Sequence, residues 1–137
     1  MKKKTLLISI IGIILIAGVG YLIKDTFRGH KSTDKKKPSV CIDATELVKE
    51  FTADEAMSFE KYAGKIVEVT GRIDEIENNE AGLKIFLRKE GDFEGVSCAM
   101  SEGYNEEDFK IGSAIKIRGE CDGFILDVTM KRCVIVE

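Results

Sequence analysis

The sequence predicts a mainly β protein, a closed barrel of five strands preceded by two short helices and by one transmembrane helix. Two segments indicate the barrel, Lys65–Ile76 and Ala114–Val136, because apolar and polar residues alternate in them as in half-buried strands. Each has a glycine in mid-strand, Gly71 and Gly119, which points to a sharp bend or a close backbone approach. A run of nineteen uncharged residues near the N-terminus indicates the transmembrane helix.

The N-terminal region divides into a basic head, residues 1–4, an apolar anchor, residues 5–23, and a basic flexible linker, residues 24–42. At about 1.5 Å per helical residue the anchor spans roughly 28 Å, close to the thickness of a hydrocarbon core. A cleaved signal peptide is the alternative, but the apolar run is longer than the usual h-region and no small-residue cleavage site follows it. We therefore expect a single-pass membrane protein.

Basic residues lie on both sides of the anchor and leave its topology open. Six of them follow it within residues 24–37 against three before it, a count that favours a cytoplasmic domain. A short basic head before an apolar run is typical of an export signal, and on that ground we expect the soluble domain outside the cytoplasm. The linker is expected to act as a spacer, with contact to anionic lipid as the alternative.

Charge separates the linker from the domain that follows it. Residues 1–42 carry a net charge of +7, whereas residues 43–137 hold 12 Lys and Arg against 22 Asp and Glu, a net charge of −10. A domain of this charge repels polyanions at long range. Nucleic acid is therefore disfavoured as a partner.

Two helices are expected at the start of the domain, residues 43–137. Asp43 and Thr52 each precede a glutamate by three positions, the spacing of a capping box. The expected helices are Ala44–Phe51 and Ala53–Tyr62. The expected strands and the helix between the third and fourth strands are Ile66–Ile76, Leu83–Arg88, Val96–Met100, a helix at Asn105–Lys110, and two long strands within Ala114–Val136.

The dipeptide Asp122-Gly123 predicts the turn between the last two strands, as a two-residue type I′ hairpin. In this register Cys121 faces Phe124, Gly119 faces Leu126, and Arg118 meets Asp127. The apolar pairs then share one face and the charged pair the other.

The same register separates Cys121 from Cys133 by roughly 30 Å, far beyond the ~7 Å limit for the Cα atoms of a disulfide. We therefore expect Cys98, Cys121 and Cys133 to be unbonded residues of the core or strand ends. Cys133 can point inward only through a bulge near Lys131-Arg132. Cys41, in the linker, is expected to be the most reactive thiol.

The order of strand, strand, strand, helix, strand, strand in about 95 residues is that of a five-stranded OB barrel. Several stretches resemble the bacterial tRNA-anticodon-domain-like OB family, tRNA_anti-like, across Asp43–Glu137. These stretches are Ala53-Asp54-Glu55-Ala56, Tyr62-Ala63-Gly64-Lys65 with Val67–Gly71, and Arg118–Gly123 with Asp127-Val128 and Cys133. The resemblance implies an OB fold behind an export or membrane segment, and it supplies no catalytic residues.

Motifs of catalysis and metal binding are absent from the sequence. The sole histidine, His30, lies in the linker, so the domain has no Ser/His or Cys/His pair. The cysteines lack CxxC spacing, and no phosphate-binding loop occurs. We expect no enzyme, no metal site and no cofactor.

One local pattern favours a ligand site. Lys84, Phe86 and Arg88 alternate with apolar residues on the expected second strand, and OB domains use an exposed aromatic flanked by cations to stack bases. Phe86 as a cover for the core is the alternative. We favour a membrane-tethered, non-catalytic binding module for a protein, peptide or oligosaccharide. Binding of single-stranded nucleic acid through these three residues ranks second, and an enzyme with an unrecognised site third.

Overall fold

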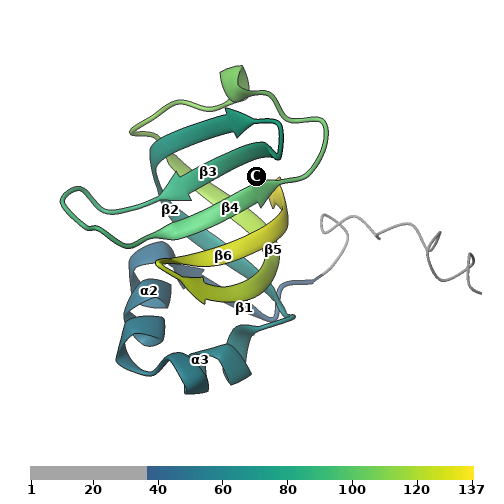
Figure 1. The fold of residues 1–137 in the computed structure, drawn as a ribbon. Helices are drawn as coiled ribbons and strands as arrows, with labels where there is room; N and C mark the ends of the chain where they lie inside the picture. Colours follow the sequence, from purple (N-terminus) through teal and green to yellow (C-terminus); the bar gives the residue numbers. More distant parts are fainter. Residues whose placement is uncertain (1–36) are drawn as a thin grey trace, which may run out of the picture. The chain divides into compact units, whose positions relative to one another are not determined.

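The computed structural model in Figure 1 describes residues 37–137. The elements are β1 (Val40–Asp43), α2 (Ala44–Ala53), α3 (Glu55–Tyr62), β2 (Ile66–Asn79), β3 (Gly82–Leu87), β4 (Val96–Met100), the 3-10 helix η2 (Glu106–Asp108), β5 (Ala114–Ile125) and β6 (Asp127–Ile135). The predicted transmembrane anchor lies outside the described residues. Within residues 37–137, no helix has both the length and the apolar character needed to span a membrane.

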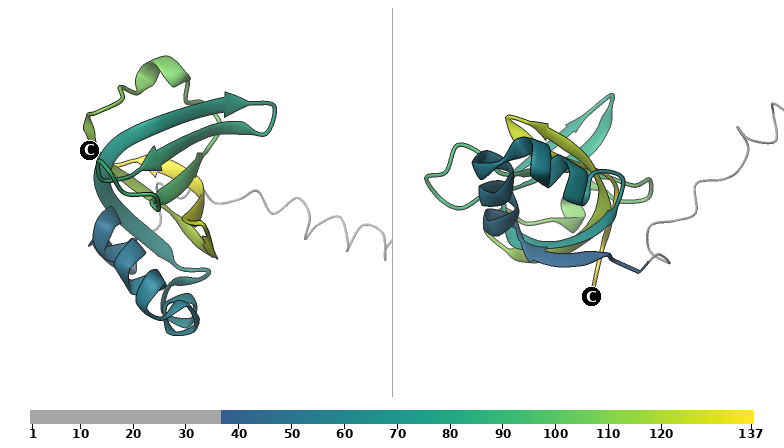
Figure 2. Two further views of the ribbon diagram at one scale, coloured as in Figure 1. Left: turned by 60° about the vertical axis from the view of Figure 1, so that its left-hand side comes forward. Right: turned by 90° about the horizontal axis from the view of Figure 1, so that it is seen from below.

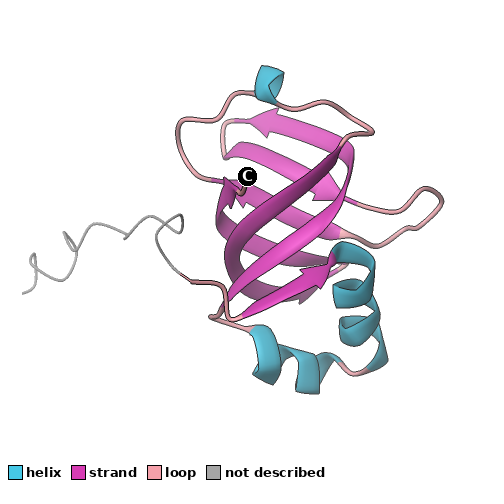
Figure 3. Cartoon of the chain, turned by 180° about the vertical axis from the view of Figure 1, so that it is seen from behind, coloured by secondary structure: helices cyan, strands magenta, loops and turns pink. Residues whose placement is uncertain are grey.

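Strands β2 to β6 form the closed barrel that the sequence predicts. The strand order is β1-β2-β3-β4-β6-β5, and pairing between β2 and β5 closes the sheet (Figure 3). The long strand β2 makes closure possible, because its first half pairs with β5 and its second half with β3. Figure 2 shows α2 and α3 at one end of the barrel and η2 at the other.

Strand β1 was not expected. It pairs in parallel with the first half of β2, from Val40 opposite Val67 to Asp43 opposite Thr70. The predicted boundary between linker and domain, at residues 42 and 43, therefore falls inside a strand. Four residues are too few for periodicity to distinguish a strand from a linker, and the strand is stabilised by pairing with residues that lie far along the chain.

The two predicted helices are present, but the second begins later than expected. Asp43 caps α2, since its Oδ1 accepts from the backbone N–H of Thr45 at 2.8 Å. Asp54, rather than Thr52, caps α3 by accepting from the N–H of Met57 at 3.0 Å. The Thr52 hydroxyl instead donates to a carbonyl of α2, and so it is not available as a cap.

The interior of the barrel is apolar, and two glycines allow its elements to approach closely. A Cβ at Gly119 would lie 2.5 Å from Sγ of Cys133, and one at Gly71 would lie 3.0 Å from Cβ of Ala44. The first distance is too short for any side chain and the second is tighter than most Cβ contacts, which confirms the predicted close approach. The largest fully buried side chains are Tyr62, Phe51, Leu47, Ile73, Ile85, Leu87, Ile117, Met130, Val67, Val69, Val96 and Val128.

The predicted hairpin register is wrong. Strand β5 continues through Asp122 and Gly123 to Ile125, and the chain reverses at Leu126. Cys121 therefore pairs with Met130 rather than facing Phe124. A bulge between Cys121 and Gly123 accommodates the Asp-Gly dipeptide within the strand.

The packing of Phe124 gives the physical reason for this later turn. Its ring stacks on that of Phe51 from α2, with centroids 5.8 Å apart. A turn at Asp122-Gly123 would forfeit this contact. As a second consequence, Arg118 does not meet Asp127 but forms an ion pair with Glu68, at 2.9 Å.

The cysteines have the expected environments. Cys98, Cys121 and Cys133 are buried and unbonded, and Cys41 is exposed, although on β1 rather than in a linker. Burial raises the pKa of Cys121 to about 11. Arg132 has a φ of 52° at an irregularity in the β5–β6 ladder, which confirms the predicted bulge that turns Cys133 inward. Cys121 and Cys133 are both free thiols in the structure, but the register from which the absence of a disulfide was inferred is wrong.

Candidate functional site

The predicted site residues lie together on the outer surface of β3. Lys84, Phe86 and Arg88 are half-buried there and alternate with the buried residues Leu83, Ile85 and Leu87. Arg88 follows the last residue of the strand. The alternation predicted from the sequence therefore brings all three side chains to one face of the barrel.

Arg88 lies within a cluster of acids from two other strands, β2 and β6. Its guanidinium is 3.1 Å from Asp74, 3.4 Å from Glu75 and 3.6 Å from Asp127. Its side chain is 19% exposed, and Nε is buried without a hydrogen-bond partner. Three carboxylates therefore already compensate the positive charge of the guanidinium, the charge with which a phosphate would have to pair.

Phe86 is also engaged by this cluster. The guanidinium carbon of Arg88 lies 5.2 Å from the centroid of the Phe86 ring, within the range of a cation–π contact. Glu75 and Ser97 are the neighbours of Phe86 across the sheet. A base that stacked on the face covered by Arg88 would have to displace the guanidinium from three carboxylates.

Lys84 differs from Arg88, since it makes no ion pair with another residue of the range 37–137. Its neighbour on β2 is Glu77, which places a carboxylate beside the lysine on the sheet. Of the two cations proposed to hold phosphates, only Lys84 is thus without a bound counter-ion. The three residues form a shared face, but its net charge is low.

A second charged cluster covers the outer face of β2 and β5. Glu68 pairs with Arg118 at 2.9 Å and with Lys116 at 3.6 Å. The hydrogen bond from Arg118, with the nearby positive charges, holds the pKa of Glu68 below its ordinary value of 4.5. Like Arg88, these cations are compensated by acids of the same barrel.

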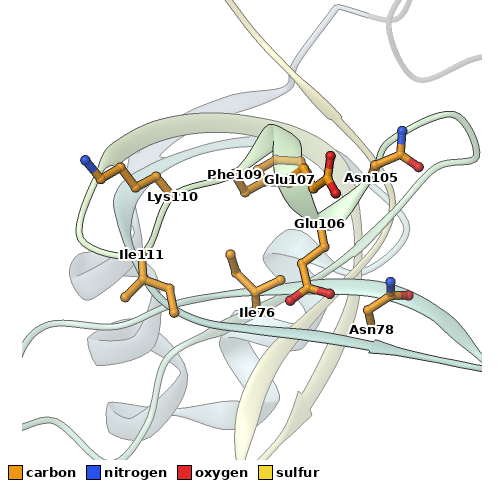
Figure 4. Close-up of a pocket in the computed structure, with 8 residues that line it drawn as sticks. All are labelled: Ile76, Asn78, Asn105, Glu106, Glu107, Phe109, Lys110 and Ile111. Atoms are coloured by element: carbon orange, nitrogen blue, oxygen red, sulfur yellow. The ribbon is translucent and has the colours of Figure 1, made fainter.

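A spacious concave site lies elsewhere, at the end of the barrel near η2. It has a volume of about 890 Å³ and is lined by Ile76, Asn78, Asn105, Glu106, Glu107, Phe109, Lys110 and Ile111 (Figure 4). We call it the barrel-end pocket. Figure 4 shows Glu106 reaching from η2 toward Ile76 and Asn78 on β2. Apolar and polar side chains thus line one space.

Local contacts fix the residues of the barrel-end pocket. The backbone N–H of Asn105 donates to Oδ2 of Asp108 at 2.8 Å, which closes the turn of η2. Phe109 is buried, with its ring 6.0 Å from that of Tyr104. The N–H of Gly112 donates to the carbonyl of Ile73 at 2.7 Å, so the segment after η2 is attached to β2.

The acids of the barrel-end pocket are not compensated in the way that those around Arg88 are. Within residues 37–137, Glu106 and Glu107 form no ion pair. No group of three or more His, Cys, Asp or Glu side chains in this range is arranged to hold a metal ion. The pocket therefore presents free acceptors beside apolar surface, which suits a ligand that has donors and an apolar group.

Comparison with known proteins identifies the family. The chain matches the tRNA_anti-like family over residues 1–135. It belongs to the tRNA_anti-like family. The match begins at residue 1 and so extends beyond the resemblance found in residues 43–137. Curated proteins give no match.

The fold of this tRNA_anti-like chain is similar to that of a solved structure. This is the crystal structure of a "putative nucleic acid-binding lipoprotein" from Klebsiella pneumoniae subsp. pneumoniae MGH 78578, with a TM-score of 0.58. The two sequences are 19% identical, and the similarity covers 70% of this chain and 91% of the other. At this identity the comparison shows a shared fold.

The barrel-end pocket of the tRNA_anti-like chain was missed by sequence reasoning. Among its lining residues, Asn105–Lys110 were predicted as a helix and Ile76 as the end of a strand, and none was predicted as a site residue. The lining residues come from two segments, one in β2 and one spanning residues 105–111, and neither contains a recognisable motif. Barrel closure brings the two segments together, and no local pattern encodes that contact.

Proposed function

We propose that the protein is a membrane-tethered binding module without catalytic activity, and that the barrel-end pocket holds its ligand. The observation that carries this proposal is the 890 Å³ pocket with its apolar lining and polar groups. Sites for small ligands typically have about 300–1,000 Å³ and this mixed lining. OB barrels accept ligands of several classes, so the pocket rather than the fold defines the ligand.

A peptide or protein segment fits the pocket best, and an oligosaccharide ranks next. Ile76, Phe109 and Ile111 offer surface for an apolar side chain, while Glu106 and Glu107 accept hydrogen bonds from amides, hydroxyls or cations. Phe109 is almost fully buried, so the pocket lacks an open aromatic platform for a sugar ring. These features together favour a peptide that bears an apolar and a basic side chain.

The proposed tether is the apolar run of residues 5–23. Its length matches a bilayer, and the Klebsiella protein of similar fold is described as a lipoprotein, which supports a place at a membrane for this chain also. We further propose that the domain lies outside the cytoplasm. Flotation of the full chain with lipid vesicles tests the tether.

Site-specific photo-cross-linking in cells tests the pocket. We place p-benzoylphenylalanine at Ile111, which lines the pocket and is 61% exposed. The matched control carries the same group at Phe93, which is 87% exposed and outside the pocket. We expect discrete adducts from position 111 alone, and mass spectrometry then gives their class. Identical adducts from both positions, or none from position 111, contradict the proposal.

Single-stranded nucleic acid is the second candidate, through Lys84, Phe86 and Arg88. It is supported by the half-buried Phe86 between two cations and by the description of the Klebsiella protein as a "putative nucleic acid-binding lipoprotein". The acids around Arg88 and the net charge of −10 on residues 43–137 oppose it. We expect weak binding at physiological salt by fluorescence anisotropy. Micromolar binding that is lost in Phe86→Ala but kept in Phe93→Ala reverses the ranking.

A further inference from the structure

The hairpin between β5 and β6 ends in an exposed apolar tip. Ile125 is 82% exposed and Leu126 is 72% exposed. Phe59 of α3 lies beside this hairpin, since its ring is 3.3 Å from the position of a Cβ at Gly123 and it lines one hollow with Ile125, and it too is exposed. We call Phe59, Ile125 and Leu126 the apolar tip. Adjacent exposed apolar side chains of this size mark an interaction surface.

The backbone at Leu126 indicates that this tip is not incidental. Its φ is 65°, in the left-handed region where glycine or asparagine is favoured and a branched apolar residue is strained. Asparagine at the turn would relieve the strain and remove exposed apolar surface. Leucine at position 126 thus destabilises the fold twice, through backbone strain and through exposed apolar surface. A residue of this kind points to a role in binding.

The charges that flank the tip are compensated. Asp122 pairs with Lys131 at 2.8 Å. Asp127 accepts from the N–H of Gly95 at 2.8 Å and lies 3.6 Å from the guanidinium of Arg88. Residues 123–126 themselves carry no charge. Glu55 and Glu60, on α3 with Phe59, are carboxylates without an ion pair within residues 37–137.

The length of the linker indicates what covers the tip. Residues 24–36 separate the proposed anchor from the described domain. At about 3.3–3.6 Å per residue, these thirteen residues keep the domain within roughly 45 Å of the bilayer. Tethering raises the effective concentration of lipid at the domain, so even side chains that partition weakly into lipid come to contact the bilayer.

We infer that the apolar tip inserts into the lipid interface of the membrane to which the chain is tethered, and so orients the barrel on that membrane. The tip needs no cationic groups for this role, because the basic linker supplies attraction to anionic lipid. The inference depends on the tether in the proposed function, and not on the barrel-end pocket or its ligand.

The chain has no tryptophan, so a single introduced indole reports on one position. We reconstitute full-length Leu126→Trp into vesicles of phosphatidylcholine, with and without lipid brominated on an acyl chain. Ile125→Trp is a second reporter in case position 126 perturbs the turn. Phe93→Trp is the matched control, because Phe93 is an apolar residue on a different loop and is at least as exposed as either tip position.

We expect brominated lipid to quench most of the emission of both tip variants and little of the Phe93→Trp emission. Equal quenching at all three positions, or none at the tip, overturns the inference. A blue-shifted tip emission that bromine does not quench places the tip against protein and also overturns it. Flotation of the unmodified chain separates the failures. A chain that does not float refutes the tether and the tip together, and a chain that floats without tip quenching refutes the tip alone.

Discussion

Replacing Arg88 by methionine removes the guanidinium that three carboxylates share, while a similar aliphatic stem remains. The pairs with Asp74 and Glu75 are solvent-exposed, and we assign each at most about 0.5 kcal/mol. The pair with Asp127 is mostly buried and the contact with Phe86 is a cation–π interaction, which together contribute about 1–1.5 kcal/mol. We therefore expect Arg88→Met to lower the free energy of unfolding by about 2 kcal/mol.

Urea unfolding of residues 32–137, followed by circular dichroism, measures this loss. For a domain of this size, about 2 kcal/mol corresponds to a fall in melting temperature of roughly 10 °C. Lys89→Met is the matched control, since Lys89 is exposed and makes no ion pair within residues 37–137, and its effect should stay within about 0.5 kcal/mol. Equal stabilities for the two variants would refute the reasoning. The guanidinium would then be free to hold a ligand, which would strengthen the nucleic-acid alternative.

Three further changes test other features of the barrel. Gly119→Ala places a Cβ against Sγ of Cys133, so urea unfolding should show a loss of about 1–3 kcal/mol, and unchanged stability would contradict the close approach. Arg118 lowers the pKa of Glu68, so this carboxylate stabilises the fold above its ordinary value of 4.5 and the contribution is lost as the pH falls. Glu68→Gln should therefore flatten the decline of the urea midpoint between about pH 7 and pH 3, and an unaltered decline would argue against the ion pair. A thiol reagent should modify Cys41 alone in the native chain and all four cysteines after unfolding, whereas rapid native reaction at more than one thiol would show that the core opens.

Local patterns were sufficient to predict most of the barrel. Alternation placed Leu83, Ile85 and Leu87 inside β3, and all three are buried. Mid-strand Gly71 and Gly119 correctly indicated close contacts between elements. These features depend on the strand itself, so a single segment of sequence contains the information.

The hairpin shows where local patterns fail. Asp122-Gly123 is a strong turn signal, but the chain turns at Leu126 because Phe124 packs on Phe51 from α2. That contact joins residues far apart in the sequence, and it outweighs the preference of the dipeptide. The bulge between Cys121 and Gly123 is the local irregularity that results, because it accommodates Gly123 within the strand.

For the face of β3, the sequence predicted which residues lie together but not which residues of other strands lie beside them. Alternation put Lys84, Phe86 and Arg88 on one face, but the acids that compensate Arg88 belong to β2 and β6. These acids come close to Arg88 only when the strands pair, so the positive charge expected for this face from the sequence was too high. The barrel-end pocket was missed because its two segments meet only in the closed barrel.

The parallel pairing of β1 with β2 has a mechanical consequence. The linker leads directly into β1, whose four residues pair with β2 from Val67 to Thr70, while the barrel-end pocket lies near the opposite end of β2 at Asn78. A pull between a membrane and a ligand held in the pocket would act along the two strands in opposite directions. Such a load shears all the hydrogen bonds of the β1–β2 ladder at once, instead of opening them one after another. Because the linker joins β1 at its first residue, this four-residue strand is loaded in shear, the geometry that best resists its separation from β2.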